Sequence, residues 1–210
     1  MSRIRSIKAA KIKVEVLREM KNLIDKGSFK DLFVSELCDR VRISKVTLFK
    51  YFPQKEDILL YYLRIWCLEL AVSLKNDPRE GLKGIYFITD ELSDQFAKHP
   101  GIILSLMGYI ATMEKISKPF AVKVEERKLL FPKEENLDTI EIKSLEQLIE
   151  GFMLEAIFKG EITKRGDTNE IMNLVLSQIY GTILTAHQHR ISPLKLYFRR
   201  NIDALLTGLK

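Results

Sequence analysis

The sequence predicts an all-α fold. Apolar side chains recur at intervals of three and four residues along most of the chain, which is the spacing of one helix face. The chain lacks the runs of alternating β-branched residues that would indicate strands, and its Gly and Pro residues fall between the periodic segments. With 210 residues, 46% of them apolar, the chain is long enough to bury a hydrophobic core.

The first half of the chain divides at helix start and stop signals. Gly27 follows the first periodic segment and is expected to end it in a left-handed conformation. Ser44 precedes a short segment as an N-cap, and Pro53 opens a long segment with Glu56 and Asp57 near its positive N-terminus. The expected helices of this half cover about residues 8–26, 32–39, 44–50, 54–75, 78–97 and 101–114.

The second half contains longer periodic segments. The stretch 115–138 is interrupted by prolines and keeps one short helix, and Gly160 is expected to end the helix after it. Asp167 or Thr168 is expected to cap the next helix, and Ser192 the last one. The expected helices cover about residues 120–130, 139–159, 168–188 and 192–209.

Charge is distributed unevenly along the chain. Residues 1–55 contain 14 Lys and Arg and 6 Asp and Glu, a balance of +8, whereas the other 155 residues contain 20 and 22, a balance of −2. A basic segment of this kind is typical of a nucleic-acid-binding end.

Several features favour a cytoplasmic protein. The first residues mix cations with apolar side chains, unlike a secretory signal, and the longest uncharged runs are too short to span a bilayer. Cys38 and Cys67 lie in apolar helical patterns, which does not suggest a disulfide framework and suits a reducing compartment.

Residues 32–52 predict two short helices joined by a sharp turn, which we call the helical corner. The side chains expected to pack inside it are Phe33, Val34, Leu37, Cys38, Val41, Ile43, Leu48 and Phe52. Those left outside are Ser44, Lys45, Val46, Thr47, Phe49, Lys50 and Tyr51. A helix with so many exposed donors, cations and aromatics is suited to the major groove of DNA.

The exposed residues match the chemistry of DNA. Lys45 can donate to guanine O6 and N7, and the methyl groups of Val46 and Thr47 can pack on thymine methyl groups. The side chains expected to hold phosphates are those of Lys50, Tyr51 and Lys55.

About 35 continuous residues resemble the TetR/AcrR family of bacterial transcriptional regulators. The motifs are Gly27-x-Phe29, Val34-x-x-Leu37-Cys38 and the string Ile-Ser-Lys-Val-Thr-Leu-Phe-Lys-Tyr-Phe-Pro-Gln-Lys-Glu-Asp that starts at Ile43. The resemblance implies a three-helix DNA-binding domain over residues 1–53, with its helix-turn-helix at about residues 32–52. A larger helical ligand-binding and dimerisation domain would follow over residues 54–210. The residues predicted to contact DNA are Ser35, Arg42, Ser44, Lys45, Val46, Thr47, Phe49, Lys50, Tyr51 and Lys55.

The sequence departs from the family pattern at four positions. Arg42 occupies a turn position that is usually Gly, and a positive φ there would cost Arg about 1 kcal/mol. Phe49 replaces a Tyr and loses a hydroxyl that would bond a phosphate. Arg18 and Glu19 replace the usual pair of Ala residues in the first helix.

Met and aromatic residues elsewhere could line an apolar effector cavity, although each could equally be ordinary core. The pocket candidates are Trp66, Tyr86, Phe96, Met107, Tyr109, Met113, Phe152 and Met172. The last two helices carry more apolar surface than one monomer face requires, and the resemblance places a dimer interface there. The interface candidates are Tyr180, Leu184, Tyr197, Phe198 and Leu205.

The sequence does not suggest an enzyme, a cofactor or a metal site. It has no Gly-rich phosphate loop and no nucleophile elbow, and His187 and His189 are spaced so that their side chains diverge on a helix. The leading hypothesis is a homodimeric regulator, most often a repressor in this family, that binds a near-palindromic operator and is released by a small effector. The alternative is a helical adaptor that binds a protein partner and has lost specific DNA binding.

Overall fold

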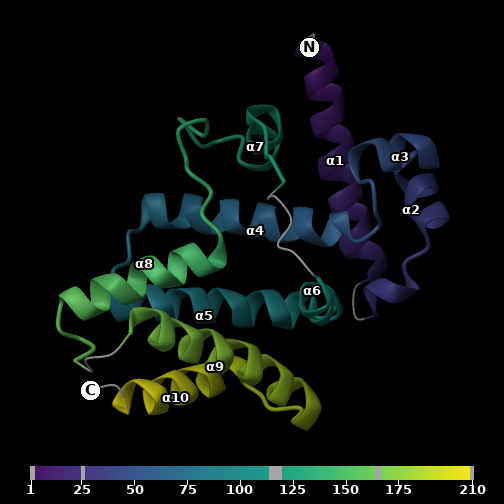
Figure 1. Cartoon of the computed structure of the whole chain (residues 1–210). Coiled ribbons are helices and arrows are strands. Elements are labelled where there is room, and N and C mark those ends of the chain that lie inside the picture. Colours follow the sequence, from purple (N-terminus) through teal and green to yellow (C-terminus); the bar gives the residue numbers. More distant parts are fainter. Residues whose placement is uncertain (1–2, 25–26, 114–119, 164–166, 209–210) are drawn as a thin grey trace. The chain divides into compact units, whose positions relative to one another are not determined.

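A computed structural model describes residues 3–24, 27–113, 120–163 and 167–208 of the chain (Figure 1). These residues form only helices and connecting segments, so the all-α prediction is confirmed. The elements are α1 Arg3–Ile24, the short 3₁₀ helix η1 Phe29–Asp31, α2 Val34–Val41, α3 Lys45–Tyr51, α4 Asp57–Asn76, α5 Gly81–Lys98, α6 Pro100–Thr112, α7 Val124–Leu130, α8 Leu145–Phe158, α9 Thr168–His189 and α10 Leu194–Thr207.

The chain folds into two compact units. Unit 1 comprises Met1–Ala71 and Lys98–Ile142, and unit 2 comprises Val72–Ala97 and Lys143–Lys210. Unit 1 therefore holds α1 to α3, most of α4, α6 and α7, and unit 2 holds nearly all of α5 and α8 to α10. Within unit 1, α6 and α7 pack against α1.

The core of unit 1 is built on α1 and α4. On α1 the buried side chains include Val16, Leu17 and Met20, whereas Leu23 is only half-buried. The aromatic ring of Tyr61 on α4 lies edge-on to that of Phe52, with 5.5 Å between ring centroids. These contacts place the segment that follows α3 directly on the core.

A buried carboxylate fixes α7 against α1 and α4. Glu126, 1% exposed, accepts hydrogen bonds from Lys13 Nζ at 2.6 Å and from the Tyr61 hydroxyl at 2.7 Å. It also accepts from the Lys123 backbone N–H at 3.0 Å, which caps the start of α7. Burial, followed by the charge of Glu126, raises the pKa of Tyr61 far above its usual range. Because all three partners are donors, the buried charge is satisfied.

Unit 2 joins α5 to α8 and α10. A methyl group at Gly84 would overlap the ring of Phe152, so glycine is required for α5 to approach α8 this closely. Arg199 of α10 forms an ion pair with Asp90 of α5 at 2.6 Å, and the Tyr86 hydroxyl donates to Asp203. The surface of unit 2 is therefore tied together by polar contacts as well as by its core.

Helix boundaries follow the capping signals in part. Asp167 caps α9 by accepting a hydrogen bond from the Asn169 N–H at 2.9 Å, and Gly160, with φ of 69°, follows α8 as predicted. α1 ends at Ile24, and the predicted stop at Gly27 follows residues 25–26, which lie outside the described residues. Ser192 does not cap the last helix, because Pro193 occupies the N-cap position of α10.

Candidate nucleic-acid interface

The turn of the helical corner is made by Arg42. This residue has φ of 57° and ψ of 47°, which is the left-handed conformation that glycine usually supplies at this turn position. Its N–H donates to the Asp39 carbonyl at 3.2 Å, and the Ile43 N–H donates to the Cys38 carbonyl at 3.0 Å. These bonds end α2 and reverse the chain within three residues, while the side chain of Arg42 stays exposed.

Ser44 starts α3 as predicted. Its Oγ accepts the Thr47 N–H at 3.1 Å and lies 2.9 Å from Thr47 Oγ1. On the inner side of the helix Leu48 is 1% exposed, and Phe52 just after it is fully buried. The cap and these two anchors fix the rotation of α3 about its axis, and so decide which side chains face outward.

The outer face of α3 carries the residues that the sequence placed there. Val46 is 81% exposed and Phe49 40% exposed. Lys45 and Lys50 are exposed beside them, and Ser35 of α2 is exposed as well. Thr47 and Tyr51 are half-buried at the margins of this face. The structure therefore brings cations, hydroxyls and methyl groups onto one helix surface.

Lys55 differs from the other predicted contacts because it is already engaged within the chain. Its Nζ donates to the Lys30 carbonyl at 3.2 Å and lies 4.9 Å from the centroid of the Phe29 ring. The side chain is half-buried and supports η1. A phosphate contact by Lys55 would therefore use only the remaining donor capacity of the ammonium group.

The prediction that Phe33 packs inside the corner is wrong. Phe33 is the N-cap residue of α2, and its side chain is 70% exposed because it precedes the first helical turn. Leu37 and Cys38 fill the interior as predicted. Burial raises the pKa of the Cys38 thiol, so this residue behaves as a small protonated core side chain.

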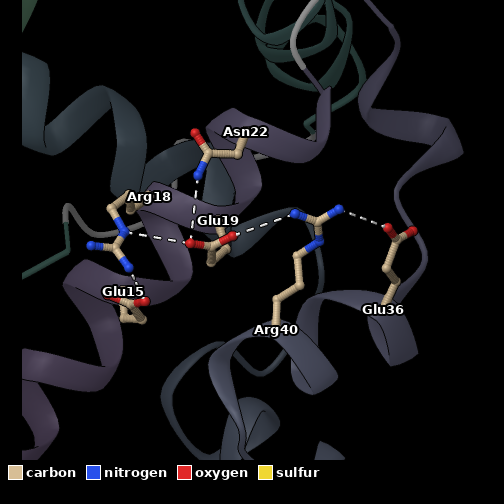
Figure 2. Close-up of polar contacts among 6 residues, drawn as sticks. All are labelled: Glu15, Arg18, Glu19, Asn22, Glu36 and Arg40. Atoms are coloured by element: carbon tan, nitrogen blue, oxygen red, sulfur yellow. Dashed lines mark hydrogen bonds and ion pairs between the residues drawn. The ribbon is translucent and has the colours of Figure 1, made fainter.

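An ion-pair network joins α2 to α1 beside the corner (Figure 2). Glu19 of α1, whose side chain is 13% exposed, lies 3.4 Å from Arg18 Nε and 3.9 Å from Arg40 of α2. Arg40 also reaches Glu36 at 3.5 Å, and Asn22 donates to Glu19 at 3.5 Å. Of the two residues that depart from the family pattern, Glu19 thus pairs with Arg40 between the two helices, whereas Arg18 pairs within α1.

The pocket candidates divide between the two units. Trp66 is 2% exposed in unit 1, where Met107, Tyr109 and Met113 are half-buried. The other four lie in unit 2, and three of them have identified packing partners: Tyr86 meets Asp203, Phe96 lies edge-on to His187, and Phe152 covers Gly84. The candidate lying in unit 2 without such a contact is Met172, which is half-buried.

The predicted dimer-interface residues on α9 are more exposed than those on α10. Tyr180 is 41% and Leu184 45% exposed, whereas Tyr197 and Leu205 are half-buried. Phe198 is fully buried within its own chain and has no surface to offer a second copy. The sequence prediction did not include Leu174 and Leu196, which are exposed. Helical spacing from Tyr180 and Tyr197 did not distinguish these two leucines from the buried residues beside them.

The described residues give two further results. Within them, no group of three or more His, Cys, Asp and Glu side chains is arranged to hold a metal ion. None of their helices is long and apolar enough to cross a membrane.

Compared by sequence, the chain matches no protein-family model and no curated protein. Its fold is similar to that of a TetR transcriptional regulator from Rhodococcus sp. RHA1, with a TM-score of 0.60, 16% identity, and coverage of 97% of this chain and 98% of the other. FadR from Bacillus subtilis, in complex with stearoyl-CoA, gives a TM-score of 0.60 at 15% identity, with coverage of 94% and 99%. The reduced form of E. coli NemR gives 0.59 at 14% identity, with coverage of 93% and 97%. The chain therefore has the fold of TetR-family regulators over nearly its whole length.

Proposed function

We propose that this chain, which has the fold of TetR-family regulators, is a homodimeric DNA-binding transcriptional regulator. The observation that carries the proposal is the outer face of α3, where Lys45, Val46 and Thr47 stand on a helix whose opposite side is anchored in the core. A helix fixed from below and exposing donors and methyl groups at its N-terminal end is suited to reading base edges in the major groove.

The remaining predicted contacts serve to position the helix. Lys50 and Arg42 are exposed cations at the two ends of α3 and can hold phosphates on either side of the groove. Phe49 offers no hydroxyl, so its exposed ring supplies apolar contact only. Base readout accordingly falls to Lys45 and its neighbours, and register to the flanking cations.

The proposed dimer uses the exposed apolar face of α9. Leu174, Tyr180 and Leu184 lie along one helix at intervals of six and four residues, and Leu196 is 55% exposed at the start of α10. A twofold axis through such a surface repeats α3 in a second subunit, which then reads the other half of a near-palindromic operator. Half-sites would lie about one DNA turn apart, roughly 34–36 Å, or somewhat more.

The proposed effector is a small apolar or amphipathic molecule with a hydrogen-bond acceptor. The indole N–H of Trp66 is buried on α4 and meets no acceptor among the described residues. Buried donors without partners are costly, so an acceptor on a ligand would be favoured there. The bound stearoyl-CoA of FadR, an amphipathic molecule, shows that this fold can hold a ligand of that kind.

Release from DNA would follow from a difference in effector affinity between two states of the protein. Because Trp66 is the single tryptophan of the chain, its fluorescence reports directly on a ligand bound beside it. Titration with acyl compounds should change the emission of Trp66 and lower DNA affinity over the same concentration range. A fluorescence change without any effect on DNA affinity would contradict the repressor-release scheme.

The function is tested by a mobility shift with the DNA upstream of the chain's own gene, together with duplexes enriched by the protein from a random library. The wild type should shift the upstream DNA and enrich a near-palindromic sequence, while the double variant Lys45→Ala, Thr47→Ala should lose this selectivity. Lys83→Ala, at an exposed position of unit 2, is the matched control for lost charge. Equal shifts for the wild type and the double variant would overturn the proposal.

A second candidate is an adaptor that binds a protein partner through the corner. The exposed apolar side chains of Phe33, Val46 and Phe49 favour it, because an apolar surface of this kind also suits a protein partner. The salt dependence of DNA binding separates the two. A DNA reader must show a steep negative slope of log affinity against log salt concentration, and an adaptor need not.

A further inference from the structure

Every charged side chain in the first three turns of α1 is a cation. Residues 3–14 include five Lys and Arg and no Asp or Glu, and the first turn of α1 has no acidic residue. The N-terminus of a helix is the positive end of its dipole, so this charge pattern is the reverse of the stabilising one. An arrangement that is unfavourable in the free protein becomes favourable when a polyanion lies against it.

Contacts with α7 hold this helical end in place. Ser6 hydrogen-bonds the carboxylate of Glu125, Ala10 is 2% exposed, and Lys13 forms its ion pair with Glu126 at 2.6 Å. Ser6, Ala10 and Lys13 recur at helical spacing and therefore share one face of α1. That face is occupied, and the helix cannot rotate to bury its other side chains.

Three cations lie on the side of α1 turned away from this contact. Arg5, Lys8 and Lys11 are exposed, and none of the three forms an ion pair with any residue that the structure describes. They span six residues, or about 9 Å along the helix axis. One DNA strand carries about three phosphates over that length, at about 3.4 Å each, so cations and phosphates match in number.

This cationic face is continuous with the helical corner. Lys11 lines an open hollow of about 740 Å³ that reaches Arg42, the last residue before the Ile43-Ser44 entry to α3. Glu15 and Glu19 also line the hollow and pair with its Arg18 and Arg40, so Lys11 and Arg42 are its cations without an ion pair among the described residues. The N-terminal end of α1 extends beyond the corner within the same unit (Figure 1). DNA seated on α3 would therefore continue toward Arg5 and Lys8.

We propose that Arg5, Lys8 and Lys11 bind the phosphate backbone of the DNA that flanks the half-site read by α3. The inference rests on the proposed function and extends it to a second DNA-contact surface. These contacts carry no base specificity, because phosphates are the same in every sequence. They add affinity. The contacts of α1 with α7 hold the three cations in position to make them.

An anionic lipid surface is the competing occupant, since Ile4 is 78% exposed next to the cations. A helix that lies on a membrane needs a broad apolar face, and here the face opposite the cations is covered by α7. DNA is favoured because the cations adjoin the corner and leave no room for a wide apolar stripe.

The test compares three proteins on a fluorescein-labelled mixed-sequence 30-bp duplex and on an operator duplex enriched by the wild type. They are the wild type, the triple variant Arg5→Ala, Lys8→Ala, Lys11→Ala, and the matched triple variant Lys83→Ala, Lys143→Ala, Arg200→Ala from exposed positions of unit 2. Alanine favours helix, so circular dichroism should show α1 intact. Affinity is measured from 50 to 200 mM salt.

The α1 variant should bind both duplexes at least about tenfold more weakly at 100 mM salt, with the ratio of the two affinities unchanged. Its log–log salt slope should be shallower by about 2.7, or 0.9 for each lost phosphate contact, and the unit 2 variant should keep the wild-type slope. An unchanged slope, or an equal change in both variants, would overturn the inference. So would loss of binding to anionic vesicles in the α1 variant with no change in its DNA slope. If the wild type itself shows no sequence preference, the proposed function fails instead.

Discussion

At the scale of single residues, Arg42 combines a backbone requirement with a possible contact. The turn needs a left-handed residue, which glycine adopts freely and arginine adopts at a cost of about 1 kcal/mol. The exposed guanidinium at the start of α3 offsets that cost only when an anion is present. In the proposed complex, a phosphate contact by Arg42 would offset the cost of the turn.

Replacing Arg42 by Gly and by Ala separates the two effects. The Arg42→Gly variant should be more stable than Arg42→Ala by about 1 kcal/mol in urea unfolding, because only glycine adopts the turn without strain. Both variants lack the charge, so both should lose about 0.9 from the log–log salt slope of DNA binding. A stability order reversed between the two variants would contradict the role assigned to the turn.

The stability of unit 1 depends on pH through Tyr61. Its hydroxyl donates to the buried Glu126 carboxylate, and burial raises its pKa above the usual value near 10. A raised pKa in the folded state means that the stabilising contribution is complete below about pH 10. It is lost as pH rises above that value, because the folded protein holds the proton more tightly than the unfolded chain.

The Tyr61→Phe variant should unfold at lower urea concentration at pH 7, with a loss of about 1–3 kcal/mol for the missing hydrogen bond to a charged group. Above pH 10 its stability should fall less steeply with pH than that of the wild type. Tyr51→Phe, which changes a half-buried hydroxyl outside this cluster, is the control. Parallel pH profiles for Tyr61→Phe and the wild type would refute the linkage.

At the scale of elements, the sequence predicts best where capping and packing agree. Ser44 and the buried Leu48 specify both the start of α3 and its inward face, so the exposed residues follow. The start of α8 was predicted near residue 139, but the helix begins at Leu145, where Ser144 and Gln147 form a reciprocal capping box. Apolar spacing alone extended that helix by six residues, because a few apolar residues precede the true cap.

The cap of α3 can be tested by two substitutions of Ser44. Ser44→Ala removes the acceptor for the Thr47 N–H and should cost about 1 kcal/mol of stability, whereas Ser44→Thr keeps an acceptor and should cost less. DNA affinity should fall in the same order, since the N-terminal turn of α3 carries the residues proposed to read bases. Equal stability of the two variants in urea unfolding would argue against the cap.

At the scale of the whole molecule, the division into units is the feature that sequence patterns could not provide. The sequence predicts an interrupted stretch over 115–138 with one short helix, yet Glu126 fastens that helix to α1 and α4 through Lys13 and Tyr61. Arg127 donates to the carbonyls of Leu137 and Ile140 at 2.5 and 2.8 Å. Lys13 and Tyr61 lie far from Glu126 in sequence, and such long-range polar pairs leave no periodic signal.

Dimer formation belongs to this scale. Leu184→Glu places a charge at the centre of the exposed face of α9, where desolvation opposes association, and should shift the protein from dimer to monomer in sedimentation velocity. Leu129→Glu, at a 41% exposed position of α7, should leave the dimer intact. A dimeric Leu184→Glu variant would move the interface away from this face.

The central claim is that α3 reads DNA sequence, and the most direct measurement is the ratio of affinities for the enriched operator and for a scrambled duplex of equal length. At one fixed salt concentration the wild type should prefer the operator by about 10³ or more. The Lys45→Ala, Thr47→Ala variant should lose at least about tenfold of that preference, while Lys83→Ala keeps it. Equal affinity of the wild type for both duplexes would contradict the account.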